Sequence, residues 1–451
     1  MSTAVNSLSR EMVGLVRRWQ AEGLPAAVRD KARLHVADAI AIGTAAAARS
    51  VLGRSALQAL GASAGAPASY PPCLAFGMSA CIHVLDYDDI HDFARVHPTV
   101  VTLPAVIAGA FSNPGSQVDP IEVVAHTNEI MCRLGVVCEP DGSNPASNYF
   151  LSQLFGYFGA ALAASLAMNF DDEALVSALG LASMQAAGAK QAAFGVGSNA
   201  RAIYPAFAAM GGVQAALLTR AGFAGPEGAF DGAAGLFPVS LGAALTAAQR
   251  ASLLDTPQWV WMQTHVKPWP SCRLSHPFVH AALIAHRQFR AADIQRVRVQ
   301  VDASVAKLCR PLEIRRRPIT LQDAKYSIPF MIAFTLVHGA PTLLNLDDRV
   351  LGDAEVLAMA QRIEVDECLP DLTGLPAGTM SLESGSDRLE LCEPLALQTD
   401  EPTVREKFGL CFNYAGRAAE APEHWESIAQ AGAGSAQALW RAFEGGRGSA
   451  C

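Results

Sequence analysis

"YFGAALAASLAMNF" occupies residues 157–170 and is followed at once by "DDEALVSALGLASMQAAGA", residues 171–189. Both stretches are rich in alanine and other small side chains, which favour the helix and allow neighbouring helices to approach closely. Asp171 and Asp172 suit the positive N-terminal end of the second segment. The pair predicts two closely packed helices and indicates a mainly α fold.

The same pattern extends through most of the first two thirds of the chain. "SREMVGLVRRWQAEG" (residues 9–23) places apolar residues on one helical stripe, with Ser9 as a candidate cap. "PAAVRDKARLHVADAIAIGTAAAA" (residues 25–48) begins with a proline suited to a first helical turn, and "AAMGGVQAALLTRAGF" (residues 208–223) ends near Gly222. We therefore expect this region to be helical.

The pattern changes after about Trp261. "IQRVRVQVDASV" (residues 294–305), "QRIEVDEC" (361–368) and "DRLELCEP" (387–394) are typical of strands, and "SIPFMIAFTLVHGA" (327–340) predicts a buried helix closed by Gly339. The tail returns to a helical pattern. We expect a mainly α protein: a large all-helical domain over residues 1–264 and 397–451, with a smaller α+β domain over residues 265–396 inserted before the C-terminal helical segment.

Bulk composition narrows the class of protein. A chain of 451 residues is too long to fold around a single compact core, so we expect at least two domains. The ten cysteines are scattered and form no C-x-x-C pair, which favours reduced thiols over disulfides or a thiolate zinc site. The net charge of −8 and the lack of basic runs disfavour nucleic acid as a partner. No apolar run reaches the roughly 18–20 residues of a membrane span, and no signal peptide is evident, so we expect no membrane association and a cytoplasmic location.

Residues 86–100, "DYDDIHDFARVHPTV", are unusually dense in aspartate and histidine, and His83 precedes them. The stretch lacks the ligand spacing of H-E-x-x-H or EF-hand sites, so it does not favour a metal. A capped, solvated loop remains open as an alternative. Aspartate beside histidine also suits proton transfer, because a carboxylate orients an imidazole that titrates near neutrality.

Two further segments carry candidate side chains. "GSNARAIYPAFAAMGG" (residues 197–212) places Arg201 and Tyr204 before a small-residue helix, where an arginine can bind a carboxylate. "HVKPWPSCRLSHPFVHAAL" (residues 265–283) contributes Lys267, Cys272, Arg273 and His276 at the predicted domain junction. An ordinary surface arginine remains the alternative for Arg201. A Cys–His nucleophilic pair is the alternative for the second segment, although the sequence offers no partner for it. No phosphate-binding glycine loop is present, so we expect no nucleotide cofactor.

These segments together resemble the MmgE/PrpD family, which includes 2-methylcitrate dehydratase, cis-aconitate decarboxylase and iminodisuccinate epimerase. The resemblance covers nearly the whole chain and is carried by ordered motifs: "HVADAIAIG" (35–43), "HVLDYDDIHDFARVHPTVVTLPA" (83–105), "HTNEIMCRLG" (126–135), "GFAGPEGAFDGAAGLF" (222–237), "KPWPSC" with "SH" (267–276), "QDAKYSIPFMIA" (322–333) and "PTVREKF" (402–408). It implies a homodimer, a site between the two domains, and chemistry on small di- or tricarboxylates without metal or cofactor.

Carried over by motif, the family's catalytic aspartate and histidine correspond to Asp86 and His97, and its lysine, cysteine and histidine to Lys267, Cys272 and His276. The chain departs from the dehydratase and decarboxylase pattern at two places. Tyr149 or Phe150 stands where those members have a histidine, and "ARAIYPA" puts Arg201 in place of a lysine and Tyr204 in place of a histidine.

The two departures remove candidate acids for expelling a hydroxyl group, whereas epimerisation needs only a proton donor on each face of a carbanion. We therefore predict an epimerase of a substituted succinate such as iminodisuccinate, with a lyase of the dehydratase or decarboxylase type as the alternative. Tyr149 and Lys267 are the predicted acid–base pair, and Asp86 is expected to orient His97. The remaining predicted site residues are His276 in catalysis and Arg201, Tyr204, Cys272 and Arg273 in substrate binding.

Overall fold

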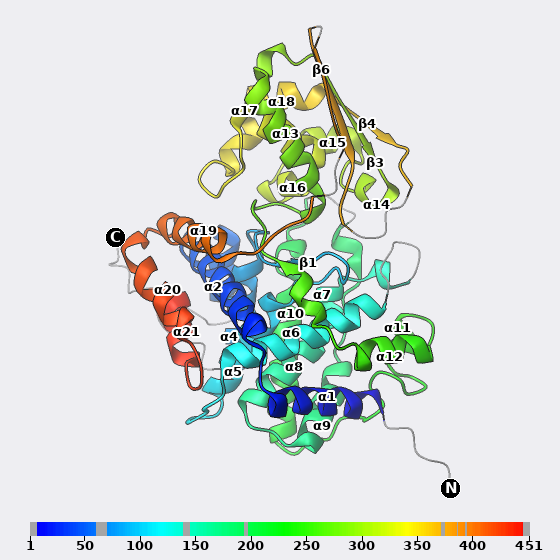
Figure 1. Cartoon of the computed structure of the whole chain (residues 1–451), viewed down its shortest axis with the longest axis vertical. Coiled ribbons are helices and arrows are strands. Elements are labelled where there is room, and N and C mark those ends of the chain that lie inside the picture. Colours follow the sequence, from blue (N-terminus) through cyan, green and yellow to red (C-terminus); the bar gives the residue numbers. More distant parts are fainter. Residues whose placement is uncertain are drawn as a thin grey trace. The chain divides into compact units, whose positions relative to one another are not determined.

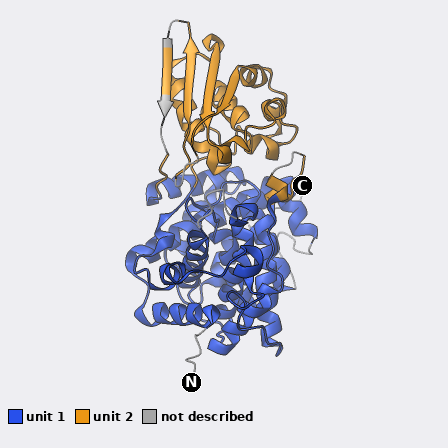
Figure 2. Cartoon of the chain, turned by 90° about the vertical axis from the view of Figure 1, so that its right-hand side faces the viewer, with its two compact units in different colours: residues 1–190, 203–266, 399–451 blue, residues 191–202, 267–398 orange. Residues whose placement is uncertain are grey.

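The computed structural model describes residues 7–59, 70–138, 145–193, 197–370, 375–385, 387–392 and 395–444 (Figure 1). The chain divides into two compact units (Figure 2): unit 1 comprises residues 1–190, 203–266 and 399–451, and unit 2 comprises residues 191–202 and 267–398. Helices predominate throughout, which confirms the predicted mainly α class.

Unit 1 is built almost entirely of helices. Their bounds are α1 (Leu8–Glu22), α2 (Ala26–Arg49), α3 (Val51–Ala59), α4 (Pro71–His83), α5 (Thr99–Phe111), α6 (Pro120–Val137), α7 (Leu151–Leu154), α8 (Gly156–Ala167), α9 (Asp172–Ser183), α10 (Tyr204–Arg220), α11 (Leu236–Ser240), α12 (Ala247–Asp255), α19 (Glu401–Tyr414), α20 (Ala421–Ala429) and α21 (Ala436–Glu444). One small departure from the all-helical prediction is the antiparallel pairing of β1 (Ile90–His91) with β2 (Thr264–His265).

The stretch that begins at Tyr157 forms most of α8, which is buried on all sides. Its small side chains allow α5 and α10 to approach very closely. A Cβ atom on Gly212 of α10 would lie 2.4 Å from the Cβ of Ala160, and one on Gly109 of α5 would lie 2.6 Å from the carbonyl oxygen of Ala164. Only glycine fits at these two contacts, so the small-residue composition directly sets the helix spacing.

Side chains cap the first turns of α1 and α9. Asp171 accepts a hydrogen bond from the backbone N–H of Ala174 at the start of α9, next to the acidic first turn. The cap of α1, however, is Ser7 and not the predicted Ser9, because the helix begins one residue before Ser9, at Leu8, and Ser9 is buried inside its first turn.

Unit 2 combines a four-stranded sheet with short helices. The strands are β3 (Arg296–Val301), β4 (Ile363–Glu367), β5 (Thr379–Ser384) and β6 (Asp387–Cys392), in the order β4-β3-β5-β6. β3 and β4 are parallel, and the other two pairs are antiparallel. The helices are α13 (His276–Gln288), α14 (Ala303–Ala306), α15 (Leu312–Arg316), α16 (Leu321–Lys325), α17 (Ile328–His338) and α18 (Ala354–Gln361).

The core of unit 2 lies between this sheet and helices α13 and α17. Val297, Val299 and Val301 of β3 are fully buried together with Phe330 and Phe334 of α17. The alternation that predicted β3 therefore marks its buried face, and Gly339 closes α17 with a φ of 77° as expected. β5 was not predicted, because only Met380 and Leu382 mark its inward face.

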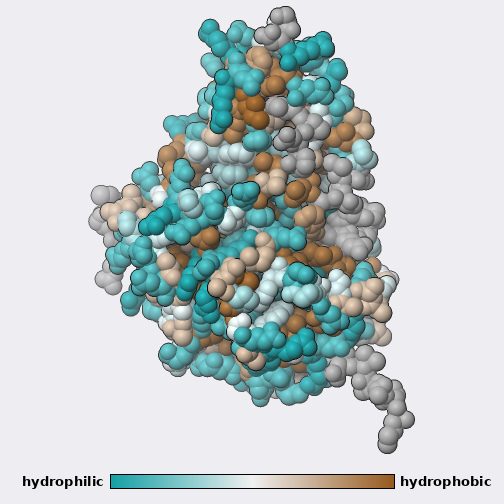
Figure 3. All heavy atoms as spheres, in the orientation of Figure 1, coloured by the Kyte–Doolittle hydropathy of each residue, from teal (hydrophilic) through white to brown (hydrophobic). Residues whose placement is uncertain are grey.

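No single helix in the described ranges is long and apolar enough to cross a membrane; α2 and α3, bent by 90° at their junction, pass that test only as a pair. On the face shown in Figure 3, hydrophilic side chains predominate and hydrophobic ones lie in small separate areas. The apolar residues of the core helices are accordingly buried, as in α17, where nine of the residues from Ile328 to Leu336 are inaccessible.

Candidate active site

The segment from His83 to His97 connects α4 to α5 and is folded tightly inside unit 1. Asp86 and Arg95 both adopt a φ of 52°, which places a turn near each end of the segment. Asp86, Asp88 and Asp89 are each no more than 2% exposed. The segment is therefore a buried structure and not the solvated loop that was left open as an alternative.

His91 and Asp92 are also buried, which further excludes the solvated loop. His91 Nε2 lies 3.0 Å from the carbonyl oxygen of Val260, and His91 Nδ1 accepts a hydrogen bond from the N–H of Ala94. His91 also belongs to β1 and pairs with Thr264 of β2. Its role is to fasten the segment to the chain around residue 260.

Asp88 is shared by two histidines. Its Oδ2 lies 2.8 Å from His83 Nδ1 and 3.3 Å from His97 Nδ1. Burial raises the pKa of Asp88, but His83 and His97 lower it more, so that its pKa lies well below the usual value. An ionised Asp88 carboxylate therefore lies between the two imidazoles.

Asp86 itself lies two residues earlier, at the first turn of the segment. Its side chain is buried, and its backbone N–H donates to the carbonyl oxygen of His83 at 2.8 Å. The predicted role of Asp86 in orienting His97 stays a prediction.

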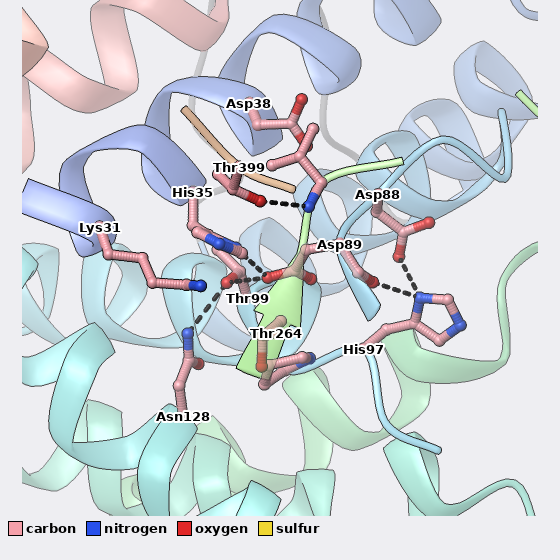
Figure 4. Close-up of polar contacts among 12 residues, drawn as sticks. Lys31, His35, Asp38, Asp88, Asp89, His97, Thr99, Asn128, Thr264 and Thr399 are labelled. Carbon is pink, nitrogen blue, oxygen red and sulfur yellow. Dashed lines mark hydrogen bonds and ion pairs between the residues drawn. The ribbon is translucent and has the colours of Figure 1, made fainter. Parts of the chain in front are cut away.

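His97 is held at its Nδ1 side, as Figure 4 shows. Nδ1 lies 2.6 Å from the carbonyl oxygen of Asp89, in addition to its contact with Asp88. The backbone N–H of His97 donates to Ser152 Oγ at 2.8 Å, and the side chain is 14% exposed. With Nδ1 engaged, Nε2 is the nitrogen left for chemistry.

Aromatic side chains line the neighbourhood of His83 and His97. Tyr204, buried at the start of α10, meets the His83 ring edge-on with 4.8 Å between centroids, and its hydroxyl donates to Ser152 at 3.3 Å. Phe150 stacks on Tyr204 at 4.1 Å. The structure thus brings the predicted Tyr204 together with His97 through the shared Ser152.

Tyr149 precedes this cluster and is half-buried. Its backbone forms a bridge with Ala189. Either Tyr149 or Phe150 stands where related enzymes have a histidine. Phe150 is buried and has no titratable group, whereas Tyr149 has a phenol hydroxyl that can transfer a proton. The assignment of Tyr149 as an acid–base group stays a prediction.

Unit 2 holds the remaining predicted residues. Lys267 and His276 are fully buried, and Cys272 and Arg273 are nearly so. The Arg201 guanidinium lies 3.5 Å above the ring centroid of Tyr326, and one of its nitrogens is 3.8 Å from Cys272 Sγ. Arg201 and Cys272, which are 71 residues apart, are therefore neighbours, and their predicted role in substrate binding stays a prediction.

Three side chains of this region escaped the sequence prediction. Tyr326 lies in the quoted "QDAKYSIPFMIA" motif but was not assigned to the site, and it supports Arg201 from below. Lys325 and Arg315 are each 3% exposed, so unit 2 buries several cations in addition to Lys267. Burial and the nearby Arg201 lower the pKa of Arg315, whose guanidinium donates to three backbone carbonyls. Arg315 thus has a structural role, and it affects other charged groups of unit 2 only through the electric field of its positive charge.

Among the described residues, one group has metal-ligand geometry: His83, Asp88 and His97, whose donor atoms lie within 4.8 Å of one another. These are the donors that also join the two imidazoles to the Asp88 carboxylate. The group could hold a divalent cation, but the same contacts suit an imidazole base with a carboxylate behind it.

Comparisons with known proteins agree with the resemblance seen in the motifs. Residues 10–248 match the MmgE/PrpD N-terminal domain, and residues 269–373 match the MmgE/PrpD C-terminal domain. The chain is similar to the cis-aconitate decarboxylase of Aspergillus terreus (strain NIH 2624 / FGSC A1156), with 24% identity over 361 residues, 74% of this chain and 73% of the relative. A second Aspergillus terreus cis-aconitate decarboxylase is 25% identical over 363 residues, with the same shares of both chains.

Proposed function

The chain belongs to the MmgE/PrpD family, and we propose that it is an enzyme that removes a proton next to a carboxylate of a small di- or tricarboxylate. The proposed outcome is epimerisation of a substituted succinate such as iminodisuccinate, without metal or cofactor. The observation that carries this proposal is the fixed His97 imidazole, with the Asp88 carboxylate and the Asp89 carbonyl at Nδ1.

His97 has the arrangement of a general base. A carbonyl oxygen only accepts hydrogen bonds, so the 2.6 Å contact with Asp89 requires the hydrogen of the neutral ring to lie on Nδ1. The lone pair then lies on Nε2, which takes the substrate proton. The imidazolium formed is stabilised by ionised Asp88, as a carboxylate stabilises histidine in other acid–base sites.

The cations of unit 2 support carboxylate binding. The C–H proton next to a carboxylate can be removed only if positive charge stabilises the dianion that develops as the proton leaves. Arg201 stays protonated under ordinary conditions, so it binds or stabilises but does not act as a base. Lys267, fully buried, supplies a second charge of this kind or a proton carrier.

Epimerisation needs a second proton donor on the opposite face of the carbanion, and we assign it to Tyr149 or Lys267. The electron pair left by the C–H bond moves into the carboxylate and returns when the new C–H bond forms, so substrate and product have the same composition. Tyr149 or Phe150 takes the place of a histidine of the related lyases, and where that residue is the buried Phe150, the position offers no acid for a departing hydroxyl group. This favours epimerisation over dehydration.

A carboxy-lyase is the second candidate, and the similarity to cis-aconitate decarboxylases favours it. Loss of carbon dioxide also leaves a carbanion, and Arg201 and Lys267 would stabilise its negative charge as they would that of the epimerase intermediate. In a decarboxylation Arg201 would keep its role in carboxylate binding, but His97 would have to start with a proton on Nε2 and give it to the carbanion left by carbon dioxide, instead of taking a proton from the substrate.

Proton NMR in D₂O separates the two candidates. The full-length protein is incubated with iminodisuccinate, and in parallel with cis-aconitate and 2-methylcitrate. We expect the signal of the carbon-bound proton of iminodisuccinate to disappear as deuterium enters, with no new alkene signal.

The histidine variants give the control. His97→Gln should abolish the exchange, whereas His338→Gln, a change at a partly exposed histidine of unit 2, should leave it intact. A new alkene product from cis-aconitate or 2-methylcitrate would replace the epimerase proposal with the lyase.

A further inference from the structure

The carboxylate of Asp89 is buried and contacts His35 and Thr99, whereas the main-chain carbonyl oxygen of Asp89 contacts His97. We infer that His35, Asp89 and Thr99 form a positioning device that sets the tautomer and orientation of His97 through the main-chain carbonyl of Asp89. This inference rests on the proposed function, since it gives a role to residues that do not touch the substrate.

Two side chains hold the Asp89 carboxylate at one oxygen. His35 Nδ1 of α2 lies 2.8 Å from Asp89 Oδ2, and Thr99 Oγ1, the first residue of α5, donates to the same oxygen at 2.5 Å. His35 is inaccessible to solvent, and Asp89 and Thr99 are nearly so. Figure 4 shows all three converging from separate elements.

A second layer fixes the hydroxyl of Thr99. Asn128 Nδ2 of α6 donates to Thr99 Oγ1 at 2.9 Å, and Asn128 Oδ1 accepts from Thr102 Oγ1 at 2.6 Å. Because Asn128 donates to Thr99, the Thr99 hydroxyl hydrogen is directed to Asp89 and not elsewhere. The carboxylate is thereby tied to α2, α5 and α6, three helices of unit 1.

The donors also settle the state of His35. A carboxylate accepts hydrogen bonds, so His35 Nδ1 carries the hydrogen, and His35 Nε2 is buried without a hydrogen-bond partner among the described residues. Burial lowers the pKa of His35, and Asp89 only partly offsets this. A neutral His35 thus donates one directed hydrogen bond and does not bring a second charge to the site.

The link from this device to His97 is short. The side chain and the carbonyl of Asp89 belong to one residue, and the next peptide plane leads into β1, which is paired with β2. A planar peptide held on both sides has little freedom to rotate, so its carbonyl oxygen keeps its direction toward His97 Nδ1, 2.6 Å away. Loosening the carboxylate would let this carbonyl turn and would release the Nδ1 hydrogen.

The burial of so many polar groups favours positioning over simple stability. A buried network of two hydroxyls, an amide, an imidazole and a carboxylate is often no better for stability than apolar packing of the same volume, but it specifies one geometry. Here the network fixes the position of His97, the one histidine between residues 83 and 97 whose ring is partly exposed.

The test uses Thr99→Val, which removes one hydroxyl without changing shape, and Thr99→Ser, which keeps it. The matched control is Thr335→Val in α17, where a fully buried threonine hydroxyl donates to the Met331 carbonyl at 2.7 Å. Two quantities are measured for each full-length protein: deuterium exchange into iminodisuccinate, and the ¹⁵N NMR shifts of the histidine rings. The His97 signals among eleven histidines are assigned from the spectrum of His97→Gln.

We expect wild-type His97 to be a single tautomer with its hydrogen on Nδ1. Thr99→Val should mix the two tautomers and lower the exchange rate about tenfold with little change in KM, because a small misplacement of a base affects the rate strongly. Thr99→Ser and Thr335→Val should resemble the wild type in both measurements.

Three results overturn the inference: a wild-type His97 with its hydrogen mainly on Nε2, a Thr99→Val protein with unchanged tautomer and rate, or an equal loss of rate in Thr335→Val. The wild-type spectrum alone decides the first of these even where Thr99→Val does not fold. Failure of the proposed function gives a different pattern, namely no exchange by the wild type with any candidate substrate, while the tautomer measurement still reports on the device.

Discussion

Asp88→Asn tests the central feature of the candidate site, the buried carboxylate next to His97. The substitution keeps the size of the side chain and an oxygen that accepts a hydrogen bond from His83, 2.8 Å away in the wild type. It removes only the negative charge. We therefore expect a folded protein whose His97 no longer has a counter-ion.

The magnitude follows from the separation of the two groups. Two unit charges 3.3 Å apart, the distance from Asp88 Oδ2 to His97 Nδ1, interact with about 5 kcal/mol at an effective dielectric constant of about 20. If about half of the proton charge has reached His97 in the transition state, the barrier rises by roughly 2.5 kcal/mol, which slows proton removal roughly 70-fold.

The assay is the initial rate of deuterium incorporation into iminodisuccinate, followed by proton NMR at saturating substrate. Asp353→Asn is the matched control, because Asp353 Oδ2 also contacts a histidine, His338 Nε2, at 2.7 Å, but in a partly exposed pair. Asparagine replaces aspartate well as the cap of α18, and an exposed ion pair contributes little. The control should keep the wild-type rate.

A rate for Asp88→Asn within twofold of the wild type would refute this reasoning. If Asp86→Asn then lost the activity instead, the orienting role would return to the residue that the sequence predicted. Loss of folding, monitored by circular dichroism, would instead show that the charge between His83 and His97 is needed for stability.

Four further results are expected. Lys407→Met should lower the free energy of unfolding by about 3 kcal/mol at pH 8 in urea unfolding, because it leaves the buried Asp38, 2.8 Å from the ammonium, without its ion pair. This loss should be smaller below pH 7. Burial already raises the pKa of Asp38 to about 7, and a protonated Asp38 needs no ion-pair partner. Burial lowers the pKa of His126, whose ring contacts the rings of both Trp19 and Trp259, to about 4. The unfolded chain takes up this proton below about pH 6.5 and the folded chain does not, so wild-type stability should fall by about 2 kcal/mol more than that of His126→Phe between pH 7 and pH 5. Arg201→Met should raise KM for the dicarboxylate roughly tenfold or more in steady-state assays, because a charge-assisted hydrogen bond contributes about 1.5–3 kcal/mol. Dialysis against EDTA should leave the exchange rate unchanged; restoration of a lost rate by one divalent cation would assign a metal to His83, Asp88 and His97.

Local patterns were sufficient for most of the architecture. The period of apolar and small residues marks the helices α8, α9 and α10, and strict alternation marks β3, because these patterns reflect the repeat of a single element. β5 was missed since two inward residues are too few to distinguish a strand from a loop, and its pairing with β3 and β6 comes from contacts distant in sequence. The cap of α1 was misplaced by two residues for a local reason, because Ser7 and Ser9 are equally suitable side chains.

The candidate site divides in the same way. The sequence alone determined that the residues from His83 to His97 hold an unusual density of acid–base groups. It also predicts that Arg201 and Cys272 belong to one site with Lys267. Only the tertiary structure places the Asp88 carboxylate against His83 and His97 and the Asp89 carboxylate against His35 of α2. Contacts such as Arg201 on Tyr326 or His35 on Asp89 join residues separated by 125 and 54 positions, and no local pattern encodes them. The residue type determines which functional group a side chain carries, but the packing of helices that are far apart in the chain determines which other side chain it contacts.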